Sequence, residues 1–320
     1  MSTQSPEFHL IQTYFKHYAQ YDDSVALGIG DDCALINTSA NTEQAISVDT
    51  SIIGRHFPAD ADPYYIACRA LNSSLSDLAA MGARARWFTL AISLPTMDDA
   101  WLAAFSKGLF AAANKAGAQL IGGDTTKSDT LTITVQVQGE VAKGTALLRS
   151  GAQIGDTVYV SGELGNAAAG LALYQQGIRQ GRLYEAYINP QPQLVLGQQL
   201  LGHANSCIDI SDGLLADLSH ILKASQCAAK IDANKLPLAK EVLDQFSQQQ
   251  ATLWALSGGD DYQLCFTSAH NPEQLKAHGI KAHAIGEIVA GTGYTVENLS
   301  DDIQLQQRGF DHFYEPSIQS

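Results

Sequence analysis

The sequence has 320 residues, of which 45% are hydrophobic and 8% aromatic, so it is long enough for two domains with packed cores. This composition excludes a disordered chain. With 19 Lys and Arg against 33 Asp and Glu, the net charge of −14 disfavours nucleic acid or an anionic membrane as the main partner, because both require a basic face. An acidic protein can still bind phosphates when divalent metals mediate the contact.

The five cysteines include no C-x-x-C pair, so neither a disulfide framework nor a zinc knuckle is expected and a reducing compartment is favoured. The first ten residues lack the basic and apolar regions of a signal peptide. No apolar run reaches the roughly 18 residues that span a bilayer. The sequence therefore predicts a soluble, cytoplasmic protein.

Helices and strands alternate along the first half of the chain. Capping residues, prolines and apolar spacing predict these elements in chain order: a helix from Ser5 with Phe8, Ile11, Phe15 and Tyr18 as its buried stripe, a strand at 45–49, a helix from Asp62 to near Gly82, a strand at 86–94, a helix from Asp98 to Gly117, and a strand at 131–141. The last strand alternates apolar and polar residues, which is typical of a sheet with one buried face.

A change in local sequence composition at residues 149–156 predicts a domain boundary, with a first domain at 1–148 and a second at 149–320. The second half continues with a strand at 157–160, a helix after Gly165, a strand at 207–210, a helix at 214–223, and strands near 228–232, 261–267 and 284–288. Both halves therefore belong to the mixed α/β class.

Aspartates gather at six places, most of them beside glycine or at the end of a predicted strand: Asp31, Asp32, Asp49, Asp77, Asp124, Asp209, Asp212, Asp260 and Asp261. We expect five of the six places to be loops at the ends of strands, where α/β proteins bind ligands. Each motif alone is also a common turn former, and Asp212 before Gly213 also fits a helix cap.

Glycine and aspartate in this combination favour phosphate chemistry. Glycine lets the backbone approach a phosphate and supplies unobstructed N–H groups. Aspartate is a usual ligand of Mg²⁺, which takes one or two carboxylates together with substrate oxygens and water. Carboxylates that converge on one cleft repel one another unless cations separate them. If these places meet in the fold, they predict several divalent ions that hold a polyphosphate.

Other common catalytic motifs are absent from the sequence. It contains no P-loop, no H-E-x-x-H zinc motif, no protein-kinase motif set and no G-x-S-x-G nucleophile elbow. Gly28 and Gly30 are followed by two aspartates and a cysteine rather than by a third glycine, which argues against a dinucleotide-binding fingerprint.

An ordered set of motifs resembles the thiamine-monophosphate kinase family, in the superfamily that includes aminoimidazole ribonucleotide synthetase and selenophosphate synthetase. The motifs are Gly30–Ala34, Ser47–Thr50, Leu75–Ala83, Gly122–Thr126, Arg149–Ala152, Ile210–Leu214, Ser257–Tyr262 and Gly309–Phe313. Each motif is weak alone, whereas their order over nearly the whole chain is specific.

The resemblance implies an N-terminal domain whose sheet pairs with that of a second subunit, a C-terminal α/β domain and an ATP site between the two. It implies transfer of a phosphoryl group from ATP to thiamine monophosphate, with Mg²⁺, to give thiamine diphosphate and ADP. A phosphate monoester has a second pKa of about 6 and is mostly ionised at pH 7, so it needs no general base to become a nucleophile. Metals and positioning must instead cancel the repulsion between two polyanions.

The resemblance also implies residue roles, with no catalytic residue beyond the metal cluster. The implied metal ligands or their neighbours are Asp32, Ser47, Asp49, Asp77, Asp124, Asp209 and Asp212. The implied ATP contacts are Gly122, Gly123, Arg149 and Ser211, and the implied substrate contacts are His56, Asp260 and Phe310. Asp260 stands where the family usually has Glu, and Phe310 where it often has Trp or Tyr.

Two other functions compete with the kinase. An ATP-dependent ligase of purine biosynthesis from the same superfamily would use similar metal and ATP loops with a different acceptor pocket. A catalytically silent nucleotide-binding protein would use the aspartates only to shape turns. Selenophosphate synthesis is disfavoured because Cys33 and Cys68 lie inside expected elements rather than in a glycine-rich N-terminal segment.

Overall fold

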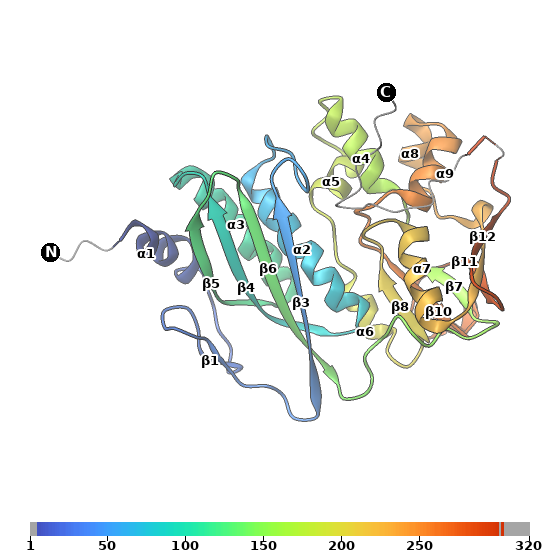
Figure 1. Ribbon diagram of the computed structural model, residues 1–320, viewed down its shortest axis with the longest axis horizontal. Helices are drawn as coiled ribbons and strands as arrows, with labels where there is room; N and C mark the ends of the chain where they lie inside the picture. The colour runs from blue at the N-terminus through green and yellow to red at the C-terminus, as the bar shows by residue number, and fades with distance from the viewer. Residues whose placement is uncertain (1–4, 301, 304–320) are drawn as a thin grey trace, which may run out of the picture. The chain divides into compact units, whose positions relative to one another are not determined.

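The computed structural model describes residues 5–300 and 302–303, which divide into two compact units (Figure 1). The first unit contains residues up to Leu147 together with Ile188–Leu201, and the second contains Leu148–Tyr187 and the residues from Gly202 onward. The chain therefore returns to the first unit for one short segment. The roles predicted for the domains 1–148 and 149–320 stay a proposal.

The first unit is a sheet with helices on one face (Figure 1). Its elements are α1 (Pro6–Leu10), the π-helix η1 (Ile11–Lys16), β1 (Val25–Leu27), β2 (Leu35–Ile36), β3 (Thr42–Ile52), α2 (Pro63–Ala80), β4 (Arg84–Leu94), α3 (Asp99–Ala116), β5 (Gln119–Lys127), β6 (Thr132–Ala142) and α6 (Leu194–Gln199). The sheet has the order β3-β6-β4-β5, in which β4 and β5 are parallel and the other pairs are antiparallel. Strands β1 and β2 form a separate antiparallel pair.

Helix α2 is buried on nearly every side because the sheet, α3 and α6 all pack against it. Asp62 caps its first turn by accepting a hydrogen bond from the Tyr64 N–H at 2.8 Å. Two glycines allow the close packing. A Cβ on Gly108 of α3 would lie 2.0 Å from the Tyr64 carbonyl oxygen, and a Cβ on Gly197 of α6 would lie 2.0 Å from that of Ala79.

The two faces of the sheet differ in chemistry. On β6, Ile133, Val135 and Val137 are buried beneath the helices, as the alternation in the sequence predicts. On the other face, turned away from α2 and α3, Ile46 and Val48 of β3 remain 57% and 60% exposed. We call this second side the open face of the sheet.

The second unit is built on a six-stranded sheet of order β12-β9-β11-β7-β10-β8. Its elements are β7 (Thr157–Val160), α4 (Asn166–Gln175), α5 (Arg182–Ile188), β8 (Ser206–Asp209), α7 (Leu214–Ser225), β9 (Ala228–Asp232), the 3-10 helix η2 (Ala233–Lys235), α8 (Lys240–Gln245), α9 (Gln248–Ser257), β10 (Leu264–Ser268), α10 (Pro272–Ala277), β11 (His283–Val289) and β12 (Gly293–Glu297). Apolar residues of β7, β8, α7 and β11 form its main core.

A buried carboxylate caps helix α4 from outside the helix. Asp261 accepts hydrogen bonds from the backbone N–H groups of Gly165 at 2.6 Å and Ala167 at 3.1 Å. These donors are unpaired within the first turn of a helix, and the partial positive charge there favours an anion. Burial nevertheless raises the pKa of Asp261 from 3.8 to about 7, although the two hydrogen bonds lower it.

The predicted mixed α/β fold is confirmed, as are the long helices and the central strands. Two expectations were wrong. Asp49 and Asp124 lie inside the long strands β3 and β5 rather than in loops, because both edge strands continue through polar residues. Phe8 and Tyr18 are 62% and 53% exposed rather than part of a buried stripe, since the first helix changes to a π-helix at Ile11.

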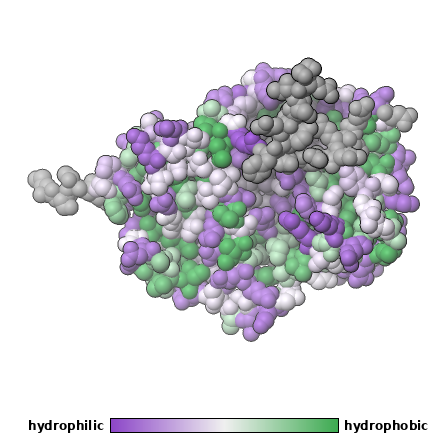
Figure 2. Space-filling model, in the orientation of Figure 1, coloured by the Kyte–Doolittle hydropathy of each residue, from purple (hydrophilic) through white to green (hydrophobic). Residues whose placement is uncertain are grey.

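None of the helices within residues 5–300 and 302–303 is long and apolar enough to cross a bilayer. Figure 2 shows hydrophobic and hydrophilic residues interspersed over the visible face, without a broad apolar belt.

The contact at Gly108 yields a prediction on stability. Gly108→Ala should lower the free energy of unfolding by about 1–3 kcal/mol, because the new methyl group would force α2 and α3 apart. Lys107→Ala, on the exposed side of the same helix, is the control and should change it by less than about 0.5 kcal/mol. Urea denaturation of both variants measures the difference. Equal stability of the two variants would contradict the prediction.

Asp261 yields a prediction on pH. Its folded-state pKa lies above the unfolded value, so the stability it contributes is present below pH 4 and is lost as the pH rises to about 7. Relative to Asp261→Asn, the free energy of unfolding of the wild type should fall by at most about 4 kcal/mol over this range. Denaturation at several pH values tests this, with the exposed Asp244→Asn as control. Parallel pH profiles of wild type and Asp261→Asn would be the contrary result.

Candidate functional site

A pocket of about 800 Å³ lies on the first unit and holds part of the predicted site. One wall is the loop of residues 28–34, which carries Asp31 and Asp32, and another is residues 122–125 of β5, which include Asp124. The N-terminal helices add Phe8, Ile11, Phe15 and Lys16. The pocket thus brings together Gly122, Gly123, Asp32 and Asp124, whose proximity the sequence left open.

Gly123 is required by its contact with the neighbouring strand. A Cβ at this position would lie 1.9 Å from the Leu90 carbonyl oxygen. Gly122 has room for a side chain, since its Cβ would meet only the Thr89 methyl group at 3.9 Å. The absence of side chains at both positions leaves the backbone of β5 uncovered at the pocket, which suits the close approach of a phosphate.

A second group of predicted residues lies between β3 and α2. The Ser47 hydroxyl donates a hydrogen bond of 2.5 Å to the Asp77 carboxylate. Asp49 follows on the same side of β3, where burial and then the negative charge of Asp77 raise its pKa from 3.8 to about 6, although a hydrogen bond with Ser74 lowers it. These three residues form a compact acidic group, which the sequence alone did not show.

These two groups lie apart within one chain. Asp49 pairs with Val135, so both side chains lie on the face of the sheet that the helices cover. Asp124 pairs with Ala91, which in turn pairs with Thr134, so these side chains lie on the open face. Strands β3 and β5 are the two edges of the sheet, so three strand spacings, about 14 Å, separate them. A single chain therefore does not bring Asp124 next to Asp49.

A third group lies in the second unit, where two loops meet. Asp209 is buried at the end of β8, and Ser211 and Asp212 follow it. The Ser211 carbonyl oxygen accepts a hydrogen bond from the Asp260 N–H at 2.8 Å, which joins the two predicted loops. Asp260 has a φ of 69°, and its carboxylate accepts a hydrogen bond from the Tyr262 hydroxyl at 3.3 Å.

Asp217 shapes this loop and was missed from the sequence. Its carboxylate accepts hydrogen bonds from the N–H groups of Ser211 and Asp212, both at 3.0 Å. Burial, followed by the charge of Asp209, raises the pKa of Asp217 from 3.8 to about 7. An acid in the first turn of α7, whose N-cap residue is Gly213, was the available signal.

The remaining predicted residues lie in different surroundings. Arg149 is exposed near the start of the second unit, where its carbonyl oxygen accepts a hydrogen bond from the Ser225 hydroxyl at 3.3 Å. His56 accepts a hydrogen bond from the Ile52 N–H on Nδ1 at 3.0 Å, which leaves the proton of a neutral ring on Nε2. Phe310 lies outside the described residues.

The carboxylates fit Mg²⁺ in pairs rather than as one large cluster. Among the residues that the structure describes, no three His, Cys, Asp or Glu side chains of one chain could hold a metal ion together. Pairs are present at Asp49 with Asp77 and in the pocket with Asp32 and Asp124. Because Mg²⁺ usually takes only one or two carboxylates and completes its shell with water and phosphate oxygens, the donor set is suitable.

Comparison with known proteins identifies the family. Residues 30–141 match the AIR synthase related protein, N-terminal domain, and residues 153–297 match the corresponding C-terminal domain. The chain is 44% identical to the thiamine-monophosphate kinase of Escherichia coli K12, over 97% of this chain and 99% of that one.

Solved structures agree with this relationship. A thiamine-monophosphate kinase from Stenotrophomonas maltophilia K279a superposes with a TM-score of 0.83 and 39% identity, covering 90% of this chain and 96% of that one. A structure described as AaThiL complexed with AMPPCP and TMP superposes with a TM-score of 0.77 and 28% identity, covering 98% and 100%. The chain belongs to the thiamine-monophosphate kinase family of AIR synthase-related proteins.

Proposed function

We propose that this protein transfers the γ-phosphoryl group of ATP to thiamine monophosphate, giving thiamine diphosphate and ADP. The 44% identity to a curated thiamine-monophosphate kinase over nearly the full length of both chains carries this proposal. The related structure described with AMPPCP and TMP supports both substrates.

The chemistry matches the residues present. An oxygen of the thiamine monophosphate attacks the γ-phosphorus, the bond from this phosphorus to the bridging oxygen breaks, and its electron pair leaves with ADP. The attacking phosphate is already ionised at pH 7, so no proton has to be removed. What the site must supply is alignment and relief of charge repulsion. Acidic pairs together with glycine-lined backbone suit this task.

Each predicted group has a part in this reaction. The pairs Asp49 with Asp77 and Asp32 with Asp124, assisted by Ser47, would hold Mg²⁺. Asp209 and Asp212 would hold further ions at the second unit. Bound Mg²⁺ supplies positive charge to the phosphate oxygens. Gly122, Gly123, Arg149 and Ser211 would bind ATP, while His56, Asp260 and Phe310 would contact thiamine monophosphate.

A homodimer would cover the open face of the sheet. This face exposes Ile46 and Val48, which a second copy would bury. With the open faces opposed and the two-fold axis along the strands, β3 of one chain lies opposite β5 of the other. Asp124 would then face the partner subunit, whereas Asp49, on the helix side of β3, stays in the acidic group of its own chain.

The competing functions differ in what they consume. The purine-biosynthesis ligase would hydrolyse ATP only with its own acceptor, and a silent nucleotide-binding protein would not consume ATP at all. The curated relatives at 41–44% identity favour the kinase.

The activity itself is the first test. Purified protein with Mg-ATP and thiamine monophosphate should form thiamine diphosphate and ADP in equal amounts, and EDTA should abolish the reaction. Chromatographic separation of the products measures both. ATP binding without product would refute the proposed acceptor, and the absence of ATP binding would refute a nucleotide site.

Two substitutions test the metal ligands. Asp49→Asn and Asp124→Asn should each abolish transfer, because an amide does not replace a charged ligand of Mg²⁺. The formation of thiamine diphosphate by each purified variant measures the loss.

Asp244→Asn, at an exposed ion pair of the second unit, is the control and should keep the wild-type activity. Near-normal activity of the variant at position 49 or 124 would refute the role of that residue as a metal ligand.

A further inference from the structure

The segment that carries Asp31 and Asp32 has its own small sheet. Strands β1 and β2 pair with each other, and β2 is followed by Asn37, whose N–H donates to the Ser24 carbonyl oxygen at 2.8 Å. Within the described residues, β1 and β2 do not pair with the four-stranded sheet of β3, β6, β4 and β5. An isolated two-stranded hairpin is marginally stable in water. Side chains at its two ends must therefore fix it against the unit.

The first end of the segment is held by Asp22 and Ser24. The Asp22 N–H donates to the Gln119 side-chain oxygen at 2.8 Å, and the Ser24 hydroxyl accepts a hydrogen bond from the Trp87 indole N–H at 2.9 Å. The Asp22 carboxylate also lies 3.7 Å from the Arg86 guanidinium. These contacts connect the chain before β1 to β4 and β5.

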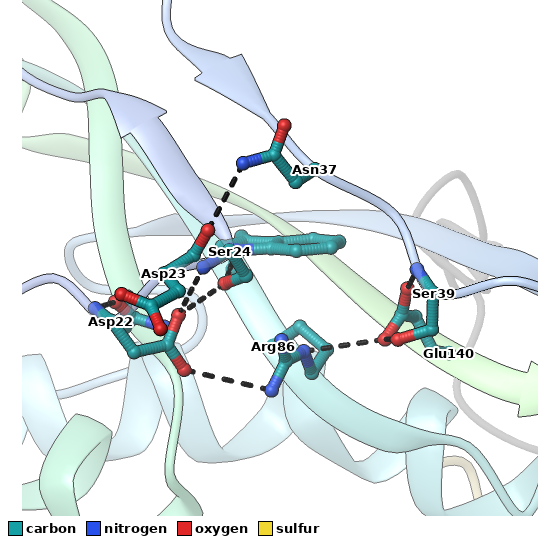
Figure 3. A network of polar contacts seen from close by, with 9 residues as sticks. Asp22, Asp23, Ser24, Asn37, Ser39, Arg86 and Glu140 are labelled. Carbon is teal, nitrogen blue, oxygen red and sulfur yellow. Dashed lines mark hydrogen bonds and ion pairs between the residues drawn. The ribbon is translucent and has the colours of Figure 1, made fainter.

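The second end is held by Glu140 of β6. Its two carboxylate oxygens accept hydrogen bonds from the Ser39 N–H at 2.6 Å and from the Ser39 hydroxyl at 2.9 Å. The same carboxylate forms an ion pair with Arg86 Nε at 3.3 Å. Figure 3 shows Arg86 between Asp22 on one side and Glu140 on the other.

Arg86 thus links both ends of the segment through one side chain. The Arg86 side chain is 12% exposed and that of Glu140 is 7% exposed, so the two charges compensate each other in buried surroundings. The Asp22 side chain, in contrast, is 53% exposed. Breaking a buried ion pair on one side leaves an uncompensated charge. The guanidinium also lies 5.3 Å from the centre of the Trp87 ring, which fixes its orientation.

We propose that Arg86 and Glu140 are positioning residues that hold Asp32 over Gly122 and Asp124, so that the nucleotide-phosphate pocket is formed before the nucleotide binds. This inference rests on the proposed function, because the pocket is taken as the site of Mg-ATP. The cost of ordering the loop is then met on folding rather than on binding. Loosening the network should weaken Mg-ATP binding and leave the binding of thiamine monophosphate unchanged.

The main test compares Glu140→Gln with the wild type in steady-state kinetics. The amide keeps the shape and one acceptor for Ser39 but loses the charge opposite Arg86. We expect the KM for Mg-ATP to rise at least fivefold, with the KM for thiamine monophosphate and kcat within twofold. Asp22→Asn, at the more exposed contact, should have a smaller effect. Asp244→Asn removes an exposed ion pair with Lys240 in the second unit and is the control.

A second measurement reports the mobility of the loop of residues 28–34 and does not depend on catalysis. Cys33 follows Asp32 and is exposed, whereas Cys68, Cys207, Cys227 and Cys265 are buried. A nitroxide label on Cys33 should therefore report the order of this loop. In Glu140→Gln the label should be more mobile than in wild type, and calorimetry should show weaker binding of Mg-ATP.

The outcomes separate the inference from the proposed function. A mobile label with weaker Mg-ATP binding supports the inference even if thiamine monophosphate is not phosphorylated, in which case only the acceptor is wrong. An unchanged label, or a mobile label with unchanged Mg-ATP affinity, overturns it. Equal rises in both KM values together with a lower melting temperature would mean that the network serves stability alone. Arg86→Lys keeps the charge and should restore part of the affinity lost in Arg86→Gln.

Discussion

Repulsion between carboxylates is the constraint on which the arrangement of this protein depends. Asp49 beside Asp77 already has a pKa of about 6, with burial as the larger cause and the charge of Asp77 as the second. Concentrating all the acidic residues in one cavity would be far more costly. The fold instead distributes them in small groups over two sheet edges and a second unit. A polyphosphate can approach such groups only together with cations, which is how a protein of net charge −14 can bind a nucleotide.

The alternation of side chains along β3 combines two tasks in one strand. Ser47 and Asp49 point toward α2, while Ile46 and Val48 between and before them are exposed on the open face. A shift of the register by one residue would exchange the two sets. The eleven consecutive pairs between β3 and β6 fix that register over the whole strand. The pairing of these strands therefore determines both where the acidic group lies and which apolar side chains the open face exposes.

The sequence was sufficient to predict the fold class and the long helices, because those features have local signals. Which acidic motifs meet was left open by the sequence, and the structure brings Ser47, Asp49 and Asp77 together, and Asp32 and Asp124 together. The sequence could not show that these groups lie on opposite faces, since that depends on strand order and register. Arg86 and Glu140 were missed for a related reason: their partners Asp22 and Ser39 are 64 and 101 residues away, respectively, and neither contact has a local pattern.

The choice of arginine at position 86 follows from the same constraint. The loop that it anchors carries two aspartates and faces a third, so an anchor made of further carboxylates alone would add to the local negative charge. A guanidinium offers several donors in a fixed plane and can therefore contact Asp22 and Glu140 at once, which an ammonium group does less well. Its charge is already matched by these two partners, so it holds the acidic loop in place without occupying the position that a metal ion would take beside Asp32 and Asp124. The anchor of the loop and the carboxylates proposed for metal binding are thus different residues of the same unit.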